Sequence, residues 1–318
     1  KKNQKKIFFS DDFKKLKKSK LVFISKDVST DKGNNSDLKS LKKLINFTIK
    51  FIGKKTKLII LSQSRPGFVR SIKYDHNNLY YQVETLVFGN AINRAVKPER
   101  FIIGVKDESK KIDSEYLKYL KTFKCPIFKM NYESAELAKI SINMYLVSMV
   151  TVTNILSEIC EKIDADWEDI KPALKLDKRL GKYAYLSSGL GISGGNLERD
   201  LKTISKIGIS TNSNVKVIDE FINHSRYRKS WLINILNKVI NDFDNPSICV
   251  LGLTYKEKTH SVKNSPSIQI LENFNKFRIN THDPEAIIKL PKNIYRKKTI
   301  KEAIKGSNIL LVCTPWQQ

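Results

Sequence analysis

Short, continuous apolar runs alternate with segments of helical spacing at both ends of this chain, and this alternation constrains its fold most. In the first third of the chain we predict strands at residues 6–10, 20–25, 57–62, 79–83 and 101–105. Residues 38–52, between two of these runs, have the spacing of a helix. Because strands that are apolar throughout must be covered on both faces, the pattern predicts a parallel sheet between layers of helices.

The middle of the chain has a different pattern. Residues 134–163 predict one long helix that is apolar nearly all round, which is typical of a helix in a large core or a subunit interface. Further helices are expected from about residue 166, over 197–207 and over 215–240. The α/β alternation then resumes, with strands at 247–253, 278–282 and 308–313 and helices at 265–274 and 301–305. The predicted order is therefore α/β, then helical, then α/β.

Four glycines fall within the seven residues 189–195, directly before a charged segment, 196–200, that is predicted to begin a helix. Glycine has no Cβ, so such a stretch can turn tightly and approach a ligand closely. The first N–H groups of a helix and its dipole favour an anion. The stretch is therefore predicted to bind a phosphate or a sugar.

The composition is that of a globular protein with two domains or slightly more, because 41% of the 318 residues are hydrophobic and 28% are charged. The formal net charge of +26 first suggests a nucleic-acid partner. However, the lysines are spread over the whole length, without interleaved aromatic residues or a nucleic-acid-binding motif. We therefore predict a solvated basic surface and no nucleic-acid partner, with a surface that favours small anions as the second interpretation.

Three further observations concern location and metals. The four cysteines have no CxxC spacing and lie in apolar surroundings, which favours buried free thiols in a reducing cytosol over metal or disulfide roles. No apolar run reaches the roughly 18–20 residues of a membrane span. The first residues lack the pattern of a signal peptide. We expect a cytoplasmic protein without a membrane span or a bound metal.

Residues 135–143 combine a lysine and an asparagine four positions apart on the long predicted helix. That spacing places Lys139 and Asn143 on one helix face, where both point into one site. A lysine there can stabilise a developing alkoxide, and an asparagine can orient a water molecule. A solvated surface lysine is the simpler interpretation of Lys139 alone, but the apolar helix and Asn143 favour the active-site role.

Other segments complete a pattern with this helix and the glycine stretch: 176–179, Asp200, 250–256 followed by Thr259, Ser265 and Pro266, and 282–284. Together they resemble the UDP-glucose/GDP-mannose dehydrogenase family over essentially all 318 residues. The resemblance implies Rossmann-like α/β domains on either side of a central long-helix dimerisation region. It places a partial NAD-binding domain at 1–130, the central domain at 131–243 and a partial sugar-nucleotide-binding domain at 244–318.

The resemblance also implies a reaction. The family oxidises the C6 alcohol of a nucleotide sugar to a carboxylate with two NAD molecules, and a cysteine of the glycine loop traps the intermediate aldehyde. By resemblance, Lys139, Asn143 and Asp200 are catalytic, and Asn196 occupies the position of the nucleophile. The expected substrate-binding residues are Glu84, Arg179, Ser187, Gly191 and Lys256, with Arg179 reaching the partner subunit's substrate. The expected cofactor-binding residues are Ser62, Gln63 and Lys263.

This chain departs from the family pattern at several of these positions. Asn196 is an amide without a usable nucleophile, Arg199 stands where the family has a lysine, and Lys263 stands where it has a cofactor-facing arginine. Phe88 replaces a glutamate that assists hydrolysis, and no GxGxxG turn follows any predicted strand. The departures concentrate on the NAD side and on the second oxidation, so we expect the 318 residues to bind NAD weakly.

The sequence thus predicts an NAD-dependent nucleotide-sugar 6-dehydrogenase that acts on the C6 alcohol of an NDP-sugar in polysaccharide precursor synthesis. The alternative is a catalytically impaired or non-catalytic homologue that binds a sugar nucleotide. In either case we expect a nucleotide-sugar ligand and a homodimer or higher homo-oligomer.

Overall fold

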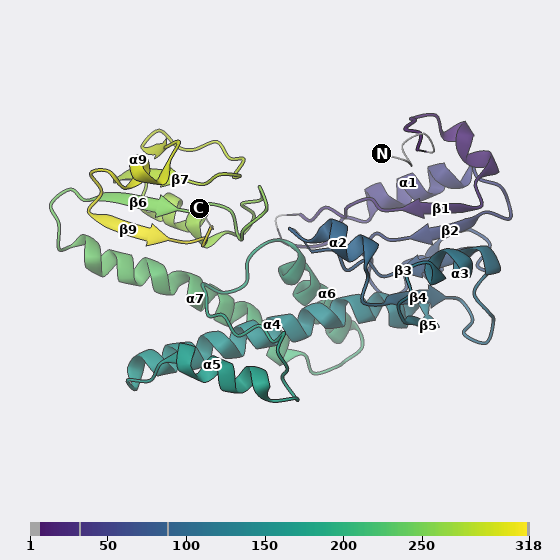
Figure 1. The fold of residues 1–318 in the computed structure, drawn as a ribbon, viewed down its shortest axis with the longest axis horizontal. Helices are drawn as coiled ribbons and strands as arrows, with labels where there is room; N and C mark the ends of the chain where they lie inside the picture. The colour runs from purple at the N-terminus through teal and green to yellow at the C-terminus, as the bar shows by residue number, and fades with distance from the viewer. Residues whose placement is uncertain (1–6, 32, 88, 317–318) are drawn as a thin grey trace. The chain divides into compact units, whose positions relative to one another are not determined.

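The structure is a computed structural model that describes residues 7–31, 33–87 and 89–316. The chain forms two compact units, residues 1–141 and 142–318, and each is described by itself (Figure 1). The α/β class predicted from the sequence is confirmed, because each unit holds a sheet with helices packed on it.

The first unit contains a five-stranded sheet in the order β1-β2-β3-β4-β5. Its strands are β1 (Leu21–Ile24), β2 (Lys57–Ile60), β3 (Leu79–Gln82), β4 (Phe101–Val105) and β5 (Ile127–Asn131). Strands β1 to β3 are parallel, and so are β4 and β5. However, β4 runs antiparallel to β3, with Tyr81 opposite Gly104. The fully parallel sheet predicted for this unit was therefore wrong at one junction, because the segment after β3 enters β4 from the same edge of the sheet.

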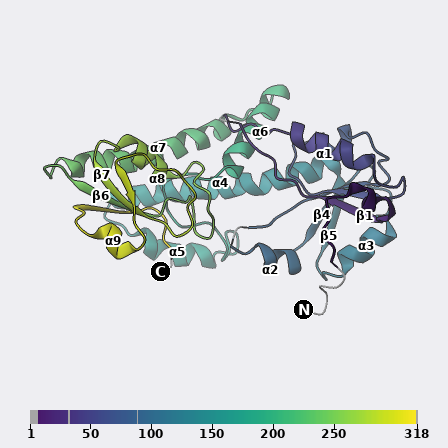
Figure 2. The ribbon, with the colours of Figure 1, turned by 90° about the horizontal axis from the view of Figure 1, so that it is seen from above.

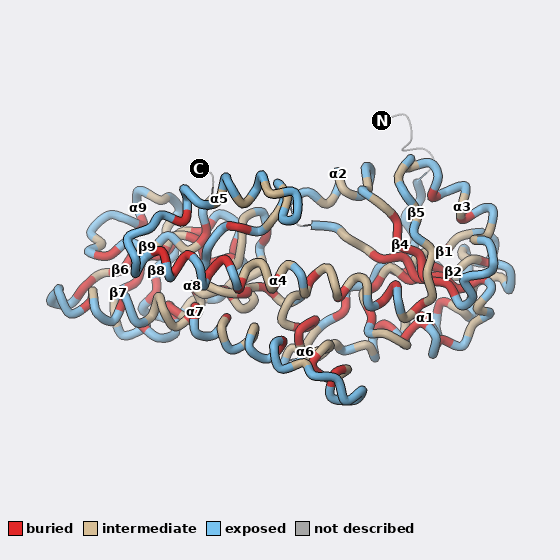
Figure 3. The backbone as a smooth tube through the Cα atoms, turned by 90° about the horizontal axis from the view of Figure 1, so that it is seen from below, coloured by how far each residue is buried: buried red, intermediate tan, exposed pale blue. Residues whose placement is uncertain are grey.

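Two apolar cores lie on opposite faces of this sheet. Helix α1 (Lys39–Ile49) contributes Leu41 and Ile45 to one core, which Tyr132 at the start of α4 also joins. Helix α3 (Ser114–Lys121) contributes Tyr116 and Leu120 to the other. Strands β3 and β4 are buried along their whole length (Figure 3). The predicted arrangement of continuous apolar strands between two helical layers is confirmed.

The sequence misplaced or missed several elements of this unit. The strand predicted at 6–10 is absent from its described part, 7–10, where Phe8 and Phe9 are almost fully exposed; Lys6 lies outside the described residues. The chain instead enters a 3-10 helix, η2 (Phe13–Lys18), capped by the Asp12 carboxylate. A second 3-10 turn, η3 (Val69–Ser71), and the short helix α2 (Ala91–Val96) were not predicted, nor were α3 and β5. Strand β5 is only half-buried, so its sequence lacks a continuous apolar run.

Helix α4 (Tyr132–Lys162) confirms the long helix predicted over 134–163. By length and composition it is the one helix, within the described ranges, that could cross a membrane, with a mean hydropathy of 1.4. Polar residues interrupt its apolar runs, which stay shorter than a span, but they leave the average hydropathy high. Part of α4 is buried inside the protein, including the polar residues Asn143, Asn154 and Glu158, and a core helix passes the same test.

The second unit continues from α4 with α5 (Trp167–Leu176), α6 (Asn196–Ser210) and α7 (Lys216–Ile240), all near their predicted positions. Helix α7 packs along α4, where Tyr227 and Arg228 donate hydrogen bonds to the Glu158 carboxylate (Figure 2). The hydrogen bond from Tyr227 is the main cause that lowers the pKa of Glu158 to about 2, and hydrogen bonds from Lys162 and Arg228 add to it, although burial opposes the shift.

A four-stranded parallel sheet follows, in the order β8-β7-β6-β9. Its elements are β6 (Ser247–Leu251), α8 (Pro266–Asn273), β7 (Arg278–His282), β8 (Ile294–Arg296), α9 (Ile300–Ile304) and β9 (Ile309–Val312). Leu236 and Ile240 of α7 pack into its apolar core. Only the three-residue strand β8 was missed, because so short a segment has no resolvable periodicity.

We predict that Gly252 is required by the fold. Gly252 follows β6 with a φ of +87°, and a Cβ there would lie 2.4 Å from Thr314 Cβ. Gly306 also has a positive φ, +72°, but open space around its Cβ position. Gly252→Ala should therefore lower the free energy of unfolding by about 2–4 kcal/mol, against about 1 kcal/mol for the control Gly306→Ala. Urea unfolding measures both, and equal losses would contradict the steric explanation.

Candidate functional site

A buried polar cluster joins α4 to α6 in the second unit. The Asn143 side-chain amide donates a short hydrogen bond to one oxygen of the Asp200 carboxylate. Arg199 Nε donates to the other oxygen at 3.1 Å. All three side chains are buried, and Asp200 is only 1% exposed. An isolated buried carboxylate is costly, so the amide and the guanidinium together make this charge tolerable. Two of the three predicted catalytic residues therefore meet.

The N-terminus of α6 begins beside this cluster. Asn196 is the first helical residue, and Gly195, which has no side chain, occupies the N-cap position. No cap side chain therefore covers the first N–H groups, which favour an anion together with the helix dipole. The sequence prediction that this segment supplies a helix N-terminus is confirmed.

Neighbouring helices hold the glycine-rich stretch before α6. The Gly189 N–H donates to Asn154 Oδ1 of α4 at 2.7 Å, and the Ile192 N–H donates to Ser225 Oγ of α7 at 2.8 Å. Gly191 has a φ of +85°, and a Cβ there would lie 2.7 Å from the Ser225 carbonyl oxygen. Glycine is thus required at 191 both by conformation and by close approach.

The loop between β6 and α8 lies against the same stretch. The Gly194 N–H donates to the Lys263 carbonyl oxygen at 3.1 Å, and a Cβ at Gly194 would lie 3.0 Å from the Tyr255 ring. The Lys263 side chain passes Gly195, where a Cβ would lie 3.2 Å from Lys263 Cδ. Lys256 is half-buried on this loop, and burial lowers the pKa of its ammonium group. This loop therefore carries Lys256, a predicted substrate-binding residue, and Lys263, a predicted cofactor-binding residue.

Asp283 has a supporting role that the sequence analysis did not predict, although it lies in the segment 282–284 of the family pattern. One oxygen of this buried carboxylate accepts hydrogen bonds from the Leu253 and Thr254 N–H groups, at 2.6 and 2.9 Å. Burial alone would raise the pKa of Asp283, but the backbone N–H groups that bond to it lower the pKa overall. Asp283 therefore holds the turn that leads to Lys256. Its partners are backbone groups far away in the sequence, so no local pattern indicates them.

Two predicted substrate residues lie on exposed segments. The Arg179 side chain is 88% exposed and pairs with Asp177 of its own segment. Ser187 is also exposed, just before the glycine-rich stretch. The structure brings neither into the hydrogen-bonded cluster of Asn143, Arg199 and Asp200. The exposure of Arg179 matches a side chain whose predicted target belongs to a partner subunit.

The remaining predicted residues belong to the first unit. Ser62 and Gln63 follow β2 at the carboxyl end of the parallel strands, the edge at which open α/β sheets bind ligands. Glu84 follows β3 and accepts a hydrogen bond from the Thr85 N–H at 2.8 Å. Lys139 is half-buried on α4, one helical turn before Asn143. Phe88 lies outside the described residues.

Glu136 is a buried acid that the sequence analysis missed. Its carboxylate accepts hydrogen bonds from Ser64 Oγ at 2.9 Å, from the Gly67 N–H at 2.7 Å and from the Val69 N–H at 3.0 Å. It thereby fastens the loop after Ser62 and Gln63 to the helix that carries Lys139. Burial raises the pKa of Glu136 to about 7, although these three donors favour its charged form. A single glutamate in the first turns of a helix gives no sequence signal for such a role, because its partners lie some seventy residues earlier in the chain.

We predict that Glu136 makes stability depend on pH near neutrality. Its pKa in the folded protein lies above its ordinary value of 4.5, so the folded state binds more protons between about pH 4.5 and 7. The contribution of Glu136 to stability is therefore complete below that range and falls as pH rises through it. Relative to Glu136→Gln, the wild type should lose about 1–3 kcal/mol between pH 5 and 8, measured by urea unfolding.

The matched control for this experiment is Glu133→Gln, one turn earlier on α4. Glu133 is partly exposed and pairs with Arg70, and the hydrogen bond from Arg70 lowers its pKa. Its charge therefore does not change between pH 5 and 8, and its stability difference from the wild type should stay constant. Parallel pH profiles for the wild type and Glu136→Gln would contradict the raised pKa.

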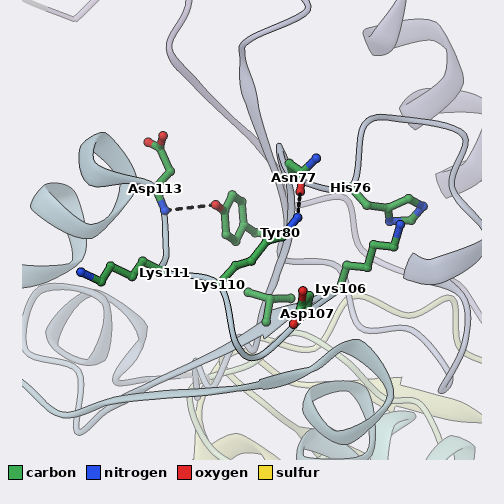
Figure 4. Close-up of a pocket in the computed structure, with 9 residues that line it drawn as sticks. His76, Asn77, Tyr80, Lys106, Asp107, Lys110, Lys111 and Asp113 are labelled. Atoms are coloured by element: carbon green, nitrogen blue, oxygen red, sulfur yellow. Dashed lines mark hydrogen bonds between the residues drawn. The ribbon is translucent and has the colours of Figure 1, made fainter.

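A separate pocket of about 190 Å³ lies in the first unit and is drawn in Figure 4. Lysines 106, 110 and 111 line it together with His76, Asp107 and Asp113, and none of the predicted site residues does. Lys110 Nζ donates to Asn77 Oδ1 at 3.0 Å, and the Tyr80 hydroxyl accepts from the Asp113 N–H at 3.1 Å. Over the ranges that the structure describes, no group of three or more His, Cys, Asp or Glu side chains could hold a metal ion.

The fold and the cluster define a two-unit α/β protein with a glycine-rich loop at a helix N-terminus. Residues 133–225 match the central domain of the UDP-glucose/GDP-mannose dehydrogenase family, and residues 249–318 match its UDP binding domain. Together the two matches cover just over half of the chain. The protein belongs to the UDP-glucose/GDP-mannose dehydrogenase family.

Individual relatives agree with this assignment. The UDP-glucose 6-dehydrogenase YwqF of Bacillus subtilis is 29% identical over 73% of this chain and 54% of its own length. The UDP-glucose 6-dehydrogenase of Rickettsia typhi is 26% identical over 98% of this chain and 74% of its own length. A UDP-glucose dehydrogenase structure from Pyrobaculum islandicum superposes with a TM-score of 0.85 at 20% identity, covering 97% of this chain and 75% of that one. This structural likeness supports the fold.

Proposed function

We propose that this protein is an NAD-linked nucleotide-sugar 6-dehydrogenase that oxidises the C6 alcohol of an NDP-sugar. The observation that carries the proposal is the buried cluster of Asn143, Arg199 and Asp200 beside the N-terminus of α6. Lys139 lies one turn before Asn143 on the same helix. A buried carboxylate and amide next to an anion-binding helix terminus suit a reaction that removes a proton while a phosphate-bearing substrate is held.

The residues divide into three proposed roles. Lys139 stabilises the developing alkoxide on O6, while Asn143 and Asp200 hold the water molecule that takes its proton. The glycine-rich stretch, Lys256, Ser187, Glu84 and Arg179 bind the nucleotide sugar. Ser62, Gln63 and Lys263 face the cofactor, since a strand end with hydroxyl and amide groups and a lysine suit a dinucleotide diphosphate. Bound NAD supplies the hydride acceptor.

Asn196 decides how far the oxidation proceeds. Transfer of hydride from C6 and loss of the O6 proton give an aldehyde, and the amide of Asn196 cannot trap it covalently. A second oxidation then requires water to add to the aldehyde first. We therefore propose that the protein releases aldehyde slowly and forms little carboxylate.

We predict that Asn196→Cys in the full-length protein increases the yield of carboxylate and reduces the free aldehyde. Covalent trapping can increase the rate by several orders of magnitude, since each ~1.4 kcal/mol by which the barrier falls increases the rate tenfold. Arg199 and Phe88 should limit the gain, so we expect about tenfold or more. The measurement is mass spectrometry of products from a panel of NDP-hexoses, with Asn196→Ser as the control that adds a much weaker nucleophile.

The same experiment tests the proposal against its alternative, a non-catalytic homologue that binds a sugar nucleotide. That alternative is favoured by Asn196, Arg199 and Lys263, which all depart from the family pattern. Rapid carboxylate formation by the wild type would show that the nucleophile lies elsewhere. Binding of UDP-glucose without turnover by any variant would establish the binding protein.

We also propose that the protein forms a homodimer through α4. We keep the domain boundaries proposed from the sequence, at about residues 130 and 243. The outer face of the helix exposes Tyr145, Val152 and Ile159, with Tyr145 73% exposed. Apolar surface of this kind in a helix is typical of an interface.

A cytoplasmic location stays a prediction, with which the four free cysteines agree.

We predict that Val152→Lys converts the dimer to a monomer, because it places a charge within the apolar face. The matched control is Val217→Lys on α7, since Val217 is similarly exposed but lies on a different helix. Light scattering at tens of micromolar should give a dimer for the wild type and the control and a monomer for Val152→Lys. A monomeric wild type would contradict the proposed interface.

A further inference from the structure

The side chain of Glu198 bridges three segments of the second unit. Glu198 lies in the first turn of α6, directly after the glycine-rich stretch. One of its oxygens accepts from Lys229 Nζ of α7 at 3.1 Å. The other accepts from Asn264 Nδ2, on the loop before α8, at 2.7 Å. The family resemblance assigned no role to Glu198, Lys229 or Asn264.

Asn264 extends the bridge into the glycine-rich stretch itself. Its Nδ2 also donates to the Gly194 carbonyl oxygen at 2.9 Å, while the Gly194 N–H donates to the carbonyl oxygen of Lys263. Both backbone groups of Gly194 are therefore bonded to residues 263–264. Asn264 has a φ of +54°, in the left-handed region, so this loop conformation must be stabilised by its surroundings.

The bridge also neutralises a buried positive charge. Lys229 is only 8% exposed, and a buried ammonium group requires an opposite charge. The Glu198 carboxylate supplies it and accepts from Asn264 with its second oxygen. A leucine at 198 would remove the charge and both acceptor oxygens. Glu198 thereby couples α7 to the order of the glycine-rich stretch.

We propose that Glu198 is a positioning residue that fixes the glycine-rich stretch against the loop of residues 255–265 and so preorganises the nucleotide-sugar site. Glycine-rich segments lose much conformational entropy when they are ordered, so a site built on one binds more tightly when that ordering precedes the ligand. This inference rests on the proposed function, because it takes the stretch and Lys256 to bind a sugar nucleotide.

The test compares Glu198→Leu with the double variant Glu198→Leu/Lys229→Met in the full protein. The single variant leaves Lys229 buried without its carboxylate, so it should lose both stability and loop order. The double variant removes both charges and should recover the melting temperature, but leucine cannot accept the hydrogen bond from Asn264. Exposed Glu220 of α7 provides the control, Glu220→Leu, which should leave exchange and affinity unchanged.

Two measurements follow each variant. Hydrogen exchange should show faster exchange of the peptides that cover residues 190–197 and 261–265 in both Glu198 variants. Titration with UDP and with UDP-glucose should show affinity reduced by about tenfold in both, with the double variant as weak as the single one. Loss of binding that persists after the melting temperature recovers distinguishes positioning from stability alone.

Two results would overturn the inference. One is unchanged exchange and affinity in Glu198→Leu. The other is recovery of exchange and affinity together with the melting temperature in the double variant, which would make Glu198 a stabilising residue only. A wild type that binds neither UDP nor UDP-glucose would contradict the proposed function instead, and the exchange data would still decide whether Glu198 orders the glycine-rich stretch.

Discussion

The buried charge of Asp200 is the constraint on which the candidate site depends. A carboxylate that is 1% exposed must be neutralised and hydrogen-bonded, and Arg199 and Asn143 do both. The bond to Asn143 ties α6 to α4 at the point where the glycine-rich stretch ends. Well-packed apolar residues would often be as stable as a buried charged pair, so stability alone does not explain one at this position. The pair instead fixes the position of the Asp200 carboxylate beside a helix N-terminus, an arrangement that suits proton transfer.

The glycine-rich stretch is held mainly through its backbone, because four of its seven residues are glycines and only Ile192 places a side chain in an apolar core. Asn154 of α4 and Ser225 of α7 each accept a hydrogen bond from one of its backbone N–H groups. The loop before α8 accepts another from Gly194. Each contact comes from a different element of the second unit. The geometry of the site is therefore a property of the packed helices and of the sheet that carries the loop, and a change in any of them alters it.

Sequence patterns predicted the long helices well, and the short helices α2 and α3 and the sheet less well. A mostly apolar segment of some thirty residues such as α4 is recognised by its length, whereas β5 is half-buried and β8 has three residues. The antiparallel junction between β3 and β4 depends on which edge the chain returns to, and no local pattern records that choice. At the site, Asn143 and Asp200 followed from the family pattern, and the structure brings them together. The supporting roles of Glu136 and Asp283 could not be found this way, although both lie in segments of that pattern, because each accepts from backbone N–H groups far away in the chain.

The residues that match the family pattern differ in what the fold demands of them. A side chain at Gly191 would collide with Ser225, so the fold itself requires that glycine whether or not a ligand binds. The first position of α6 makes no such demand, since either a thiol or the amide of Asn196 can begin the helix, and only the thiol would give a nucleophile activated by the helix dipole. A match at a glycine therefore says little about activity, and the replacement at 196 changes chemistry without changing structure. Lys139 carries more weight, because it lies in the interior of α4, where no cap or turn requires its side chain, and yet it stands one turn from Asn143.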